Sequence, residues 1–191
     1  MRRRLARRTQ DRRSQALRGA LAQLCLLLAA LLLAGCYARD AEPPAAAEPA
    51  LGEPVQFTFG TLTGDEVSSD TTRGRTTALL FVTTYDLASQ AQTQLLREVL
   101  SSHKPVANAA IVMMEPPRAA ELARVWADAL SLTWPIAMAT PSLMAGDSQL
   151  GRINGVPTLI VLDRRGRIIA KNEGALNRQG IQDCLARADA R

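Results

Sequence analysis

Residues 79–89 read LLFVTTYDLAS, and this stretch contains the transition around which the fold is organised. Residues 78–82 form a continuous apolar run, which is typical of a central strand buried on both faces of a sheet. Asp86 is a favourable N-cap residue, and the apolar positions within 95–100 recur with helical spacing. The stretch therefore predicts a buried strand that leads directly into a helix over residues 87–102.

Strand and helix patterns alternate on both sides of this stretch. Helical crossovers make the middle strands parallel, whereas a short turn at 163–166 makes the last two strands antiparallel. The order predicts an α/β fold with a mixed central β-sheet flanked by helices on both faces. The predicted strands are 55–59, 76–83, 109–114, 134–138, 157–162 and 167–171. Two of the predicted helices are 87–102 and 177–188. A third helix opens at Pro116-Pro117, and its expected inner face is an apolar stripe of Leu122, Val125, Trp126, Ala129 and Leu130.

The charge of the chain is divided between a basic leader and a mildly acidic body. The formal net charge is +5. Residues 1–35 contain eight arginines and one acidic residue, so residues 36–191 carry 15 basic and 17 acidic residues, a net charge of −2. Sequence-independent binding to nucleic acid needs many clustered cations. A nucleic-acid partner is therefore not expected.

The first 36 residues have the layout of a secretory signal. A basic stretch at 1–18 precedes an apolar run from Ala20 to Ala34, which is shorter than the roughly 20 residues of a membrane span. The run ends at Leu33-Ala34-Gly35-Cys36, which resembles the lipobox of bacterial lipoproteins. The resemblance implies a signal peptide over 1–35 and a mature chain that is held in a membrane by acyl chains on Cys36. A short transmembrane helix with an incidental cysteine is the alternative.

Residues 36–54 join the lipidated cysteine to a folded domain over 55–191. The segment YARDAEPPAAAEPALGEP has four prolines and no apolar periodicity, so we expect an extended tether. At about 3.1 Å per residue this tether would span roughly 55 Å. Tyr37 follows Cys36 where an aspartate retention signal would stand, which favours the outer membrane, on the periplasmic side of a bacterial cell envelope.

Two regions of the domain resemble thioredoxin-like proteins of the TlpA/ResA and peroxiredoxin-related redoxin group. One runs from Phe57 to Tyr85; the other, more specific one is Gly155-Val156-Pro157-Thr158 with the strand and turn after it. The resemblance covers about residues 55–188 and implies a thioredoxin-like fold. It also implies that Pro157 is cis and that the backbone beside it is an open edge for extended peptides. A trans Pro157 that merely starts an edge strand is the alternative.

The resemblance places the group's two redox cysteines at Asp86 and Ser89. Neither a carboxylate nor an alcohol can exchange with a disulfide or become a sulfenic acid. No catalytic residue, metal or cofactor is therefore expected, and Asp86 is expected to cap the helix. The residues that remain at this place, called here the former active-site surface, are Tyr85, Asp86, Ser89, Val156 and Pro157.

Few other side chains are candidates for chemistry. Cys184 shares an apolar helical face with Ile181 and Leu185, so we expect a buried core residue. His103, the single histidine, is expected to be a solvated cation at a helix end. The methionines on apolar elements are expected to pack in the core rather than to bind copper.

Three functions agree with these features. The first is a redox-inactive lipoprotein that binds an envelope protein or a ligand at the former active-site surface. The second is a thiol-disulfide oxidoreductase or peroxidase-type enzyme of the cell envelope, which would use Cys184 or a partner's cysteines. The third is a structural envelope lipoprotein. We expect the first, because both thiol positions are replaced while the framework around them is kept.

Overall fold

A computed structural model describes residues 52–191 of the protein. The signal peptide expected at 1–35, the lipidation site Cys36 and the tether as far as residue 51 lie outside the described residues. Between residues 52 and 191, no helix is both long enough and apolar enough to cross a bilayer.

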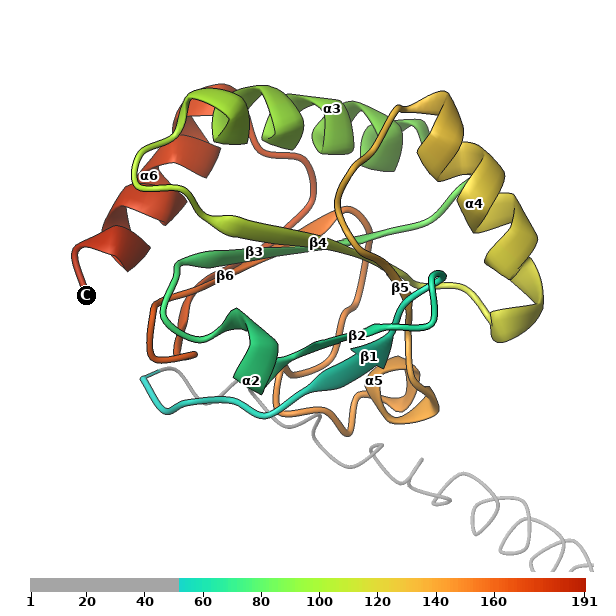
Figure 1. Ribbon diagram of the computed structural model, residues 1–191, viewed down its shortest axis with the longest axis horizontal. Coiled ribbons are helices and arrows are strands. Elements are labelled where there is room, and N and C mark those ends of the chain that lie inside the picture. Colours follow the sequence, from blue (N-terminus) through green and yellow to red (C-terminus); the bar gives the residue numbers. More distant parts are fainter. Residues whose placement is uncertain (1–51) are drawn as a thin grey trace, which may run out of the picture. The chain divides into compact units, whose positions relative to one another are not determined.

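The centre of the domain is a mixed five-stranded sheet (Figure 1). The order across the sheet is β5 (Ile136–Met138), β4 (Asn108–Met113), β3 (Thr77–Val82), β6 (Thr158–Leu162) and β7 (Ile168–Glu173). Strands β5, β4 and β3 are parallel, β6 is antiparallel to β3, and β7 is antiparallel to β6. All six residues of β3 are buried, as expected for a strand covered on both faces.

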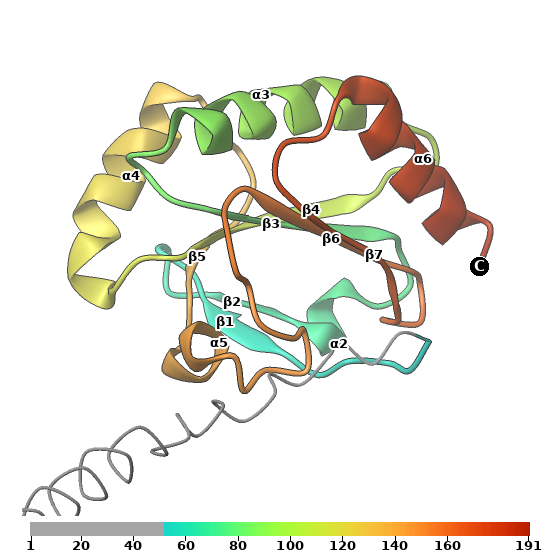
Figure 2. The same cartoon turned by 180° about the vertical axis from the view of Figure 1, so that it is seen from behind.

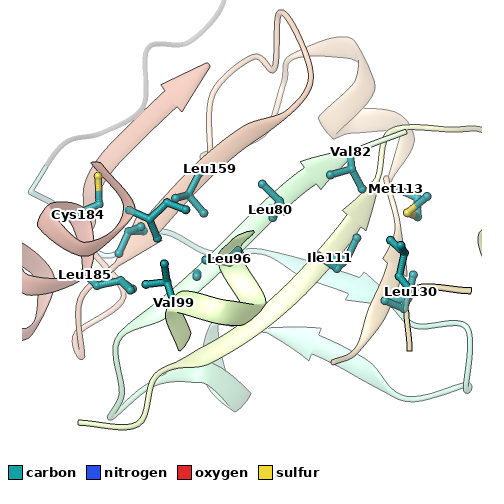
Figure 3. Packing of buried hydrophobic residues seen from close by; sticks show 14 of the residues in the cluster. Leu80, Val82, Leu96, Val99, Ile111, Met113, Leu130, Leu159, Cys184 and Leu185 are labelled. Carbon is teal, nitrogen blue, oxygen red and sulfur yellow. The ribbon is translucent and has the colours of Figure 1, made fainter. Parts of the chain in front are cut away.

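Three helices cover one face of the sheet (Figure 2). They are α3 (Leu87–Ser102), α4 (Ala120–Ala129) and α6 (Arg178–Asp189). In Figure 3, Leu80 from β3 and Leu159 from β6 lie in one cluster with Leu96 of α3 and Leu185 of α6. The predicted helix at 87–102 is confirmed with the same bounds.

The other face is covered by shorter elements (Figures 1 and 2). These are the antiparallel ribbon of β1 (Thr58–Gly60) and β2 (Glu66–Ser68), helix α2 (Ser69–Thr72) and helix α5 (Pro141–Ala145). The strand predicted at 55–59 is displaced to 58–60, although Val55, Phe57 and Phe59 are buried as its alternation required. Strand β2 and helices α2 and α5 are too short to show periodicity and were not predicted, whereas the equally short β5 and β6 lie within the apolar stretches predicted at 134–138 and 157–162.

Helix α4 turns a different side to the sheet from the one predicted. Leu122 and Val125 are 54% and 64% exposed, and Ala129 is exposed as well, whereas Trp126 and Leu130 are buried as expected. The buried face is completed by Ala123 and Ala127. Apolar residues occur on two sides of this helix, so their spacing alone could not select the side that contacts the sheet.

Candidate functional site

The carboxylate of Asp86 caps the first turn of α3. It accepts hydrogen bonds from the backbone N–H of Ala88 (3.3 Å) and of Ser89 (2.7 Å). The Ser89 hydroxyl also donates to the same carboxylate at 2.6 Å. Asp86 thus satisfies N–H groups that a helix start leaves without intrahelical partners, and the predicted cap is confirmed.

Ser89 is fully buried at the third position of the helix. Besides donating to Asp86, its hydroxyl oxygen accepts the N–H of Thr83, at 3.4 Å. Its backbone carbonyl accepts the Thr93 hydroxyl at 2.8 Å. The hydroxyl therefore links the end of β3 to the start of α3, and it is not accessible to solvent.

These contacts also set the charge at the site. The hydrogen bond from the Ser89 hydroxyl, followed by those from the backbone N–H groups, lowers the pKa of Asp86 below its ordinary value, although partial burial opposes the shift. Asp86 is therefore an anion at neutral pH. A permanent negative charge at the helix start is favourable for the helix dipole, and it offers a hydrogen-bond acceptor but no nucleophilic sulfur.

The loop before β6 lies at the same end of the sheet as this cap. Phe81 of β3 pairs with Thr158 of β6, so the residues after Phe81 approach the residues before Thr158. The Val156–Pro157 peptide bond is cis, as predicted. The carbonyl of Pro157 accepts the N–H of Gly174 at 2.8 Å, whereas Val156 takes part in no backbone hydrogen bond within residues 52–191. The backbone N–H and C=O of Val156 therefore have no backbone hydrogen-bond partner in the described residues.

Two large apolar side chains flank Asp86 and point into solvent. Tyr85 is 80% exposed and Leu87 is 81% exposed. Val156 is partly exposed and Pro157 is buried. The register thus brings the cap, the exposed apolar pair and the cis-proline loop to one end of the sheet.

Sequence reasoning missed a buried carboxylate at this end. Glu115 lies two residues after the end of β4, and it is 5% exposed. One of its oxygens accepts the N–H of Thr84 at 3.1 Å and the Thr84 hydroxyl at 2.7 Å. The other oxygen and the Thr83 hydroxyl are buried without a hydrogen-bond partner in the described chain. The available signal was a glutamate placed between a buried strand and Pro116-Pro117.

A second missed residue is Gln92, in the second turn of α3. It is buried, and its side-chain oxygen accepts the N–H of Leu176 at 2.7 Å. This contact ties α3 to the segment that follows β7. Gln92 lies on the inner face of the predicted helix, and a buried polar side chain requires a hydrogen-bond partner. This position could therefore have identified it from the sequence.

The remaining candidate side chains lie elsewhere. Cys184 is buried in α6, and its sulfur lies 3.4 Å from Asn172 Nδ2 and 3.3 Å from an Arg187 guanidinium nitrogen. His103 is not exposed to solvent as expected: its side chain is largely buried, and its Nε2 lies 2.8 Å from a carboxylate oxygen of Asp189. Packing of α6 against the end of α3 brings these two residues together, which the sequence of α3 alone could not show. Within residues 52–191, no group of three or more potential ligands is suited to a metal ion.

Comparisons with known proteins identify the fold through solved structures. No family model matches the sequence, and no curated protein matches it either. Among solved structures, the chain is similar to a DsbF homologue from Corynebacterium diphtheriae, with 21% identity, 70% of this chain and 85% of that chain covered, and a TM-score of 0.60. It is similar to a thiol:disulfide interchange protein of the thioredoxin family from Chlorobium tepidum, with 20% identity, coverages of 75% and 99%, and a TM-score of 0.60.

The chain is also similar to Etrx1, an exposed lipoprotein thioredoxin from Streptococcus pneumoniae. The identity is 14%, 69% of this chain and 98% of that chain are covered, and the TM-score is 0.56. The domain therefore has a thioredoxin-like fold, and the predicted fold class is confirmed. At these identities the likeness defines the fold, and the chemistry has to be argued from the site.

Proposed function

We propose that the protein is a redox-inactive thioredoxin-like lipoprotein of the bacterial cell envelope, which binds an extended protein segment at the former active-site surface. The observation that carries the proposal is the contact between Ser89 and Asp86. Oxidoreductases of this fold need one thiolate that attacks and a second sulfur that resolves the mixed disulfide. In this chain the corresponding positions hold the Asp86 carboxylate and the Ser89 hydroxyl, which are joined by a hydrogen bond.

The surface around this contact has the features that peptide binding needs. The peptide group of Val156 makes no backbone hydrogen bond within the described chain, so it can pair with an extended segment as a sheet edge does. Tyr85 and Leu87 supply exposed apolar area beside it. Asp86 adds an acceptor with a fixed negative charge. The expected occupant is an extended, partly apolar segment of an envelope protein.

Anchoring to a membrane is proposed from the sequence around Cys36, and it is supported by the structural likeness to the pneumococcal lipoprotein Etrx1. Tyr37 follows Cys36 where an aspartate retention signal would stand, which favours the periplasmic side of the outer membrane. Replacing the acylated thiol by Cys36→Ser should abolish labelling with radioactive palmitate and release the chain from membranes. Labelling that persists in this variant would refute the anchor.

Reduced, carboxymethylated insulin B chain is a suitable probe for peptide binding, since it is extended and cannot exchange disulfides. We expect fluorescence anisotropy to show binding that is weakened by the double variant Tyr85→Ala/Leu87→Ala. The matched control is Leu122→Ala/Val125→Ala, which removes exposed apolar area from α4 and should leave binding unchanged. Equal binding by both variants would contradict the proposed surface.

The alternatives give different outcomes. An oxidoreductase would reduce native insulin in the presence of dithiothreitol, or consume peroxide, and Cys184→Ser would abolish that turnover. We expect no turnover from the wild-type chain. A structural lipoprotein would show neither turnover nor binding of the carboxymethylated chain.

A further inference from the structure

The end of the sheet opposite the former active-site surface gathers three separate loops. Thr77 pairs with both Leu162 and Asn108, so the segments that flank these residues meet there. The N–H of Gly74 donates to the carbonyl of Arg164 at 2.9 Å, which joins the loop before β3 to the β6–β7 turn. The third loop, at 103–107, precedes β4.

Four exposed cations project from these loops. Within residues 52–191, none of their side chains takes part in an ion pair or a hydrogen bond. They come from three segments that lie far apart in the sequence, which is why composition did not reveal them. These residues, called here the cationic face, are Arg75, Lys104, Arg164 and Arg165.

The acidic side chains at this end are mostly occupied. Asp163 is buried against Arg167, with 2.7 Å between their charged atoms. Asp189 is largely buried against His103 and also accepts the hydroxyl of Thr76 at 2.6 Å. Asp70 is an exposed carboxylate 3.7 Å from Arg73, and Glu53 is a second exposed carboxylate beside this end, so the four cations outnumber the exposed acidic side chains.

A hollow lies between two members of the cationic face. Its volume is about 320 Å³, and Arg75 and Arg164 line it. Backbone at Gly74 and the 59% exposed side chain of Val106 complete the opening. Two arginines and an apolar rim at Val106 suit a phosphate ester that carries an apolar chain.

The chain also enters the domain at this end. The N–H of Val55 donates to the carbonyl of Gly166 at 2.9 Å, and Pro54 pairs with Arg167 as an isolated β-bridge. In Figure 1, the cyan start of the described chain lies on the same side of the domain as the β6–β7 turn, away from the start of α3. Residue 52 is separated from Cys36 by 15 residues, so the proposed anchor leads to this end.

We propose that the cationic face binds the anionic phospholipid surface of the membrane in which Cys36 is anchored. The inference rests on the proposed lipid anchor. Arginine and lysine side chains near an anionic surface each strengthen binding about fivefold, and a tether makes the local concentration high. The six residues of β3 separate the two ends by roughly 20 Å, so binding would direct the former active-site surface away from the bilayer.

The lysines of the chain provide a direct measurement. Lys104 belongs to the cationic face, whereas Lys171 lies on β7 and donates to the carbonyls of Leu150 and Arg152. These two are the lysines of the sequence. The mature, lipidated protein is bound to vesicles of phosphatidylcholine alone or with phosphatidylglycerol, and a water-soluble amine-acetylating reagent is added. We expect the acetylation of Lys104 to slow about fivefold on the anionic vesicles and to recover at high salt, while that of Lys171 stays constant.

Variants of the cationic face test whether contact with the lipid surface protects Lys104. Arg164→Gln/Arg165→Gln should remove most of the protection of Lys104, whereas the charge-matched control Arg118→Gln/Arg178→Gln should keep it. Equal acetylation of Lys104 on both vesicle types would overturn the proposal. Protection on neutral vesicles by inorganic phosphate alone would overturn it as well, because the hollow would then be a site for a free anion.

Flotation distinguishes this proposal from the lipid anchor. Flotation with neutral vesicles reports the anchor, because these vesicles carry no net charge. A chain that floats with anionic vesicles only would refute the anchor and still support the cationic face. A chain that floats with both and shows no protection of Lys104 would keep the anchor and refute the face.

Discussion

The hydroxyl of Ser89 donates a hydrogen bond of 2.6 Å to the carboxylate of Asp86, and the two residues close the first turn of α3. They stand at the two positions that the thioredoxin-like resemblance assigns to a thiol pair. The two residues stabilise the helix start through this contact, and they occupy the positions of the thiols that disulfide exchange requires. The same pair of residues thus caps the helix and leaves no thiol at either position.

Removal of the cap should destabilise the domain. Asp86→Ala leaves N–H groups at the start of α3 and the buried Ser89 hydroxyl without their acceptor, and we expect a loss of about 2 kcal/mol in the free energy of unfolding. Urea denaturation followed by circular dichroism measures this loss. The control Asp147→Ala removes an exposed loop carboxylate and should change stability by less than about 0.5 kcal/mol. Equal losses would contradict the importance of the cap.

Two aspartates should make the domain sensitive to acid. Burial raises the pKa of Asp163, but hydrogen bonds from Arg167 and Arg165 outweigh it and lower the pKa overall. The pKa of Asp86 is lowered chiefly by the Ser89 hydroxyl. The unfolded state then binds more protons, so this stability is fully present above the unfolded pKa of about 3.9 and is lost as pH falls through the folded value.

Urea midpoints measured between about pH 2 and pH 6 follow this loss. The double variant Asp86→Asn/Asp163→Asn should have a flatter acid limb than the wild type, because neither amide titrates. A double variant that keeps the full slope would assign the acid sensitivity to other carboxylates.

Restoring the thiols should restore redox chemistry. In Asp86→Cys/Ser89→Cys, a thiol at the helix start has a lowered pKa and a second sulfur lies one turn away. We expect reduction of insulin with dithiothreitol by the double variant and not by either single variant. A folded double variant that forms its disulfide yet shows no turnover would mean that more than the thiols is missing from this surface.

Glu115 should stabilise the strand ends beside the site. Glu115→Ala removes the acceptor of the Thr84 N–H and hydroxyl, at an expected cost of about 2 kcal/mol in urea denaturation. Glu121→Ala is the control, since Glu121 forms an exposed ion pair with Arg124 worth less than about 0.5 kcal/mol. If Glu115→Ala left the free energy of unfolding unchanged, water would have replaced Glu115 as the hydrogen-bond partner of Thr84.

Cys184 should be inert in the folded domain. It is 3% exposed and packs between α6 and the sheet, so a maleimide should react with it only when the helix opens. Mass spectrometry should show labelling in urea and almost none in buffer over the same time. Rapid labelling in buffer would reopen a redox role for this thiol.

Long elements were predicted from the sequence more accurately than short ones. Helix α3 was predicted with its observed bounds because sixteen residues contain several turns of periodicity and Asp86 marks the start. The ribbon of β1 and β2 was not recognised as a pair, and the buried face of α4 was wrong at Leu122 and Val125. Short segments and helices with two apolar sides take their arrangement from what they contact.

The sequence by itself determined the order of the five central strands and the three long helices, the cap at Asp86 and the absence of sulfur at positions 86 and 89, since these depend on local pattern and residue identity. Only the tertiary structure decided which distant groups meet. The register of β3, β4 and β6 places Glu115 and the Val156–Pro157 loop beside the cap, and it gathers the cationic face at the opposite end. Such contacts join residues far apart in the chain, because strand pairing and helix packing bury apolar surface across the whole domain.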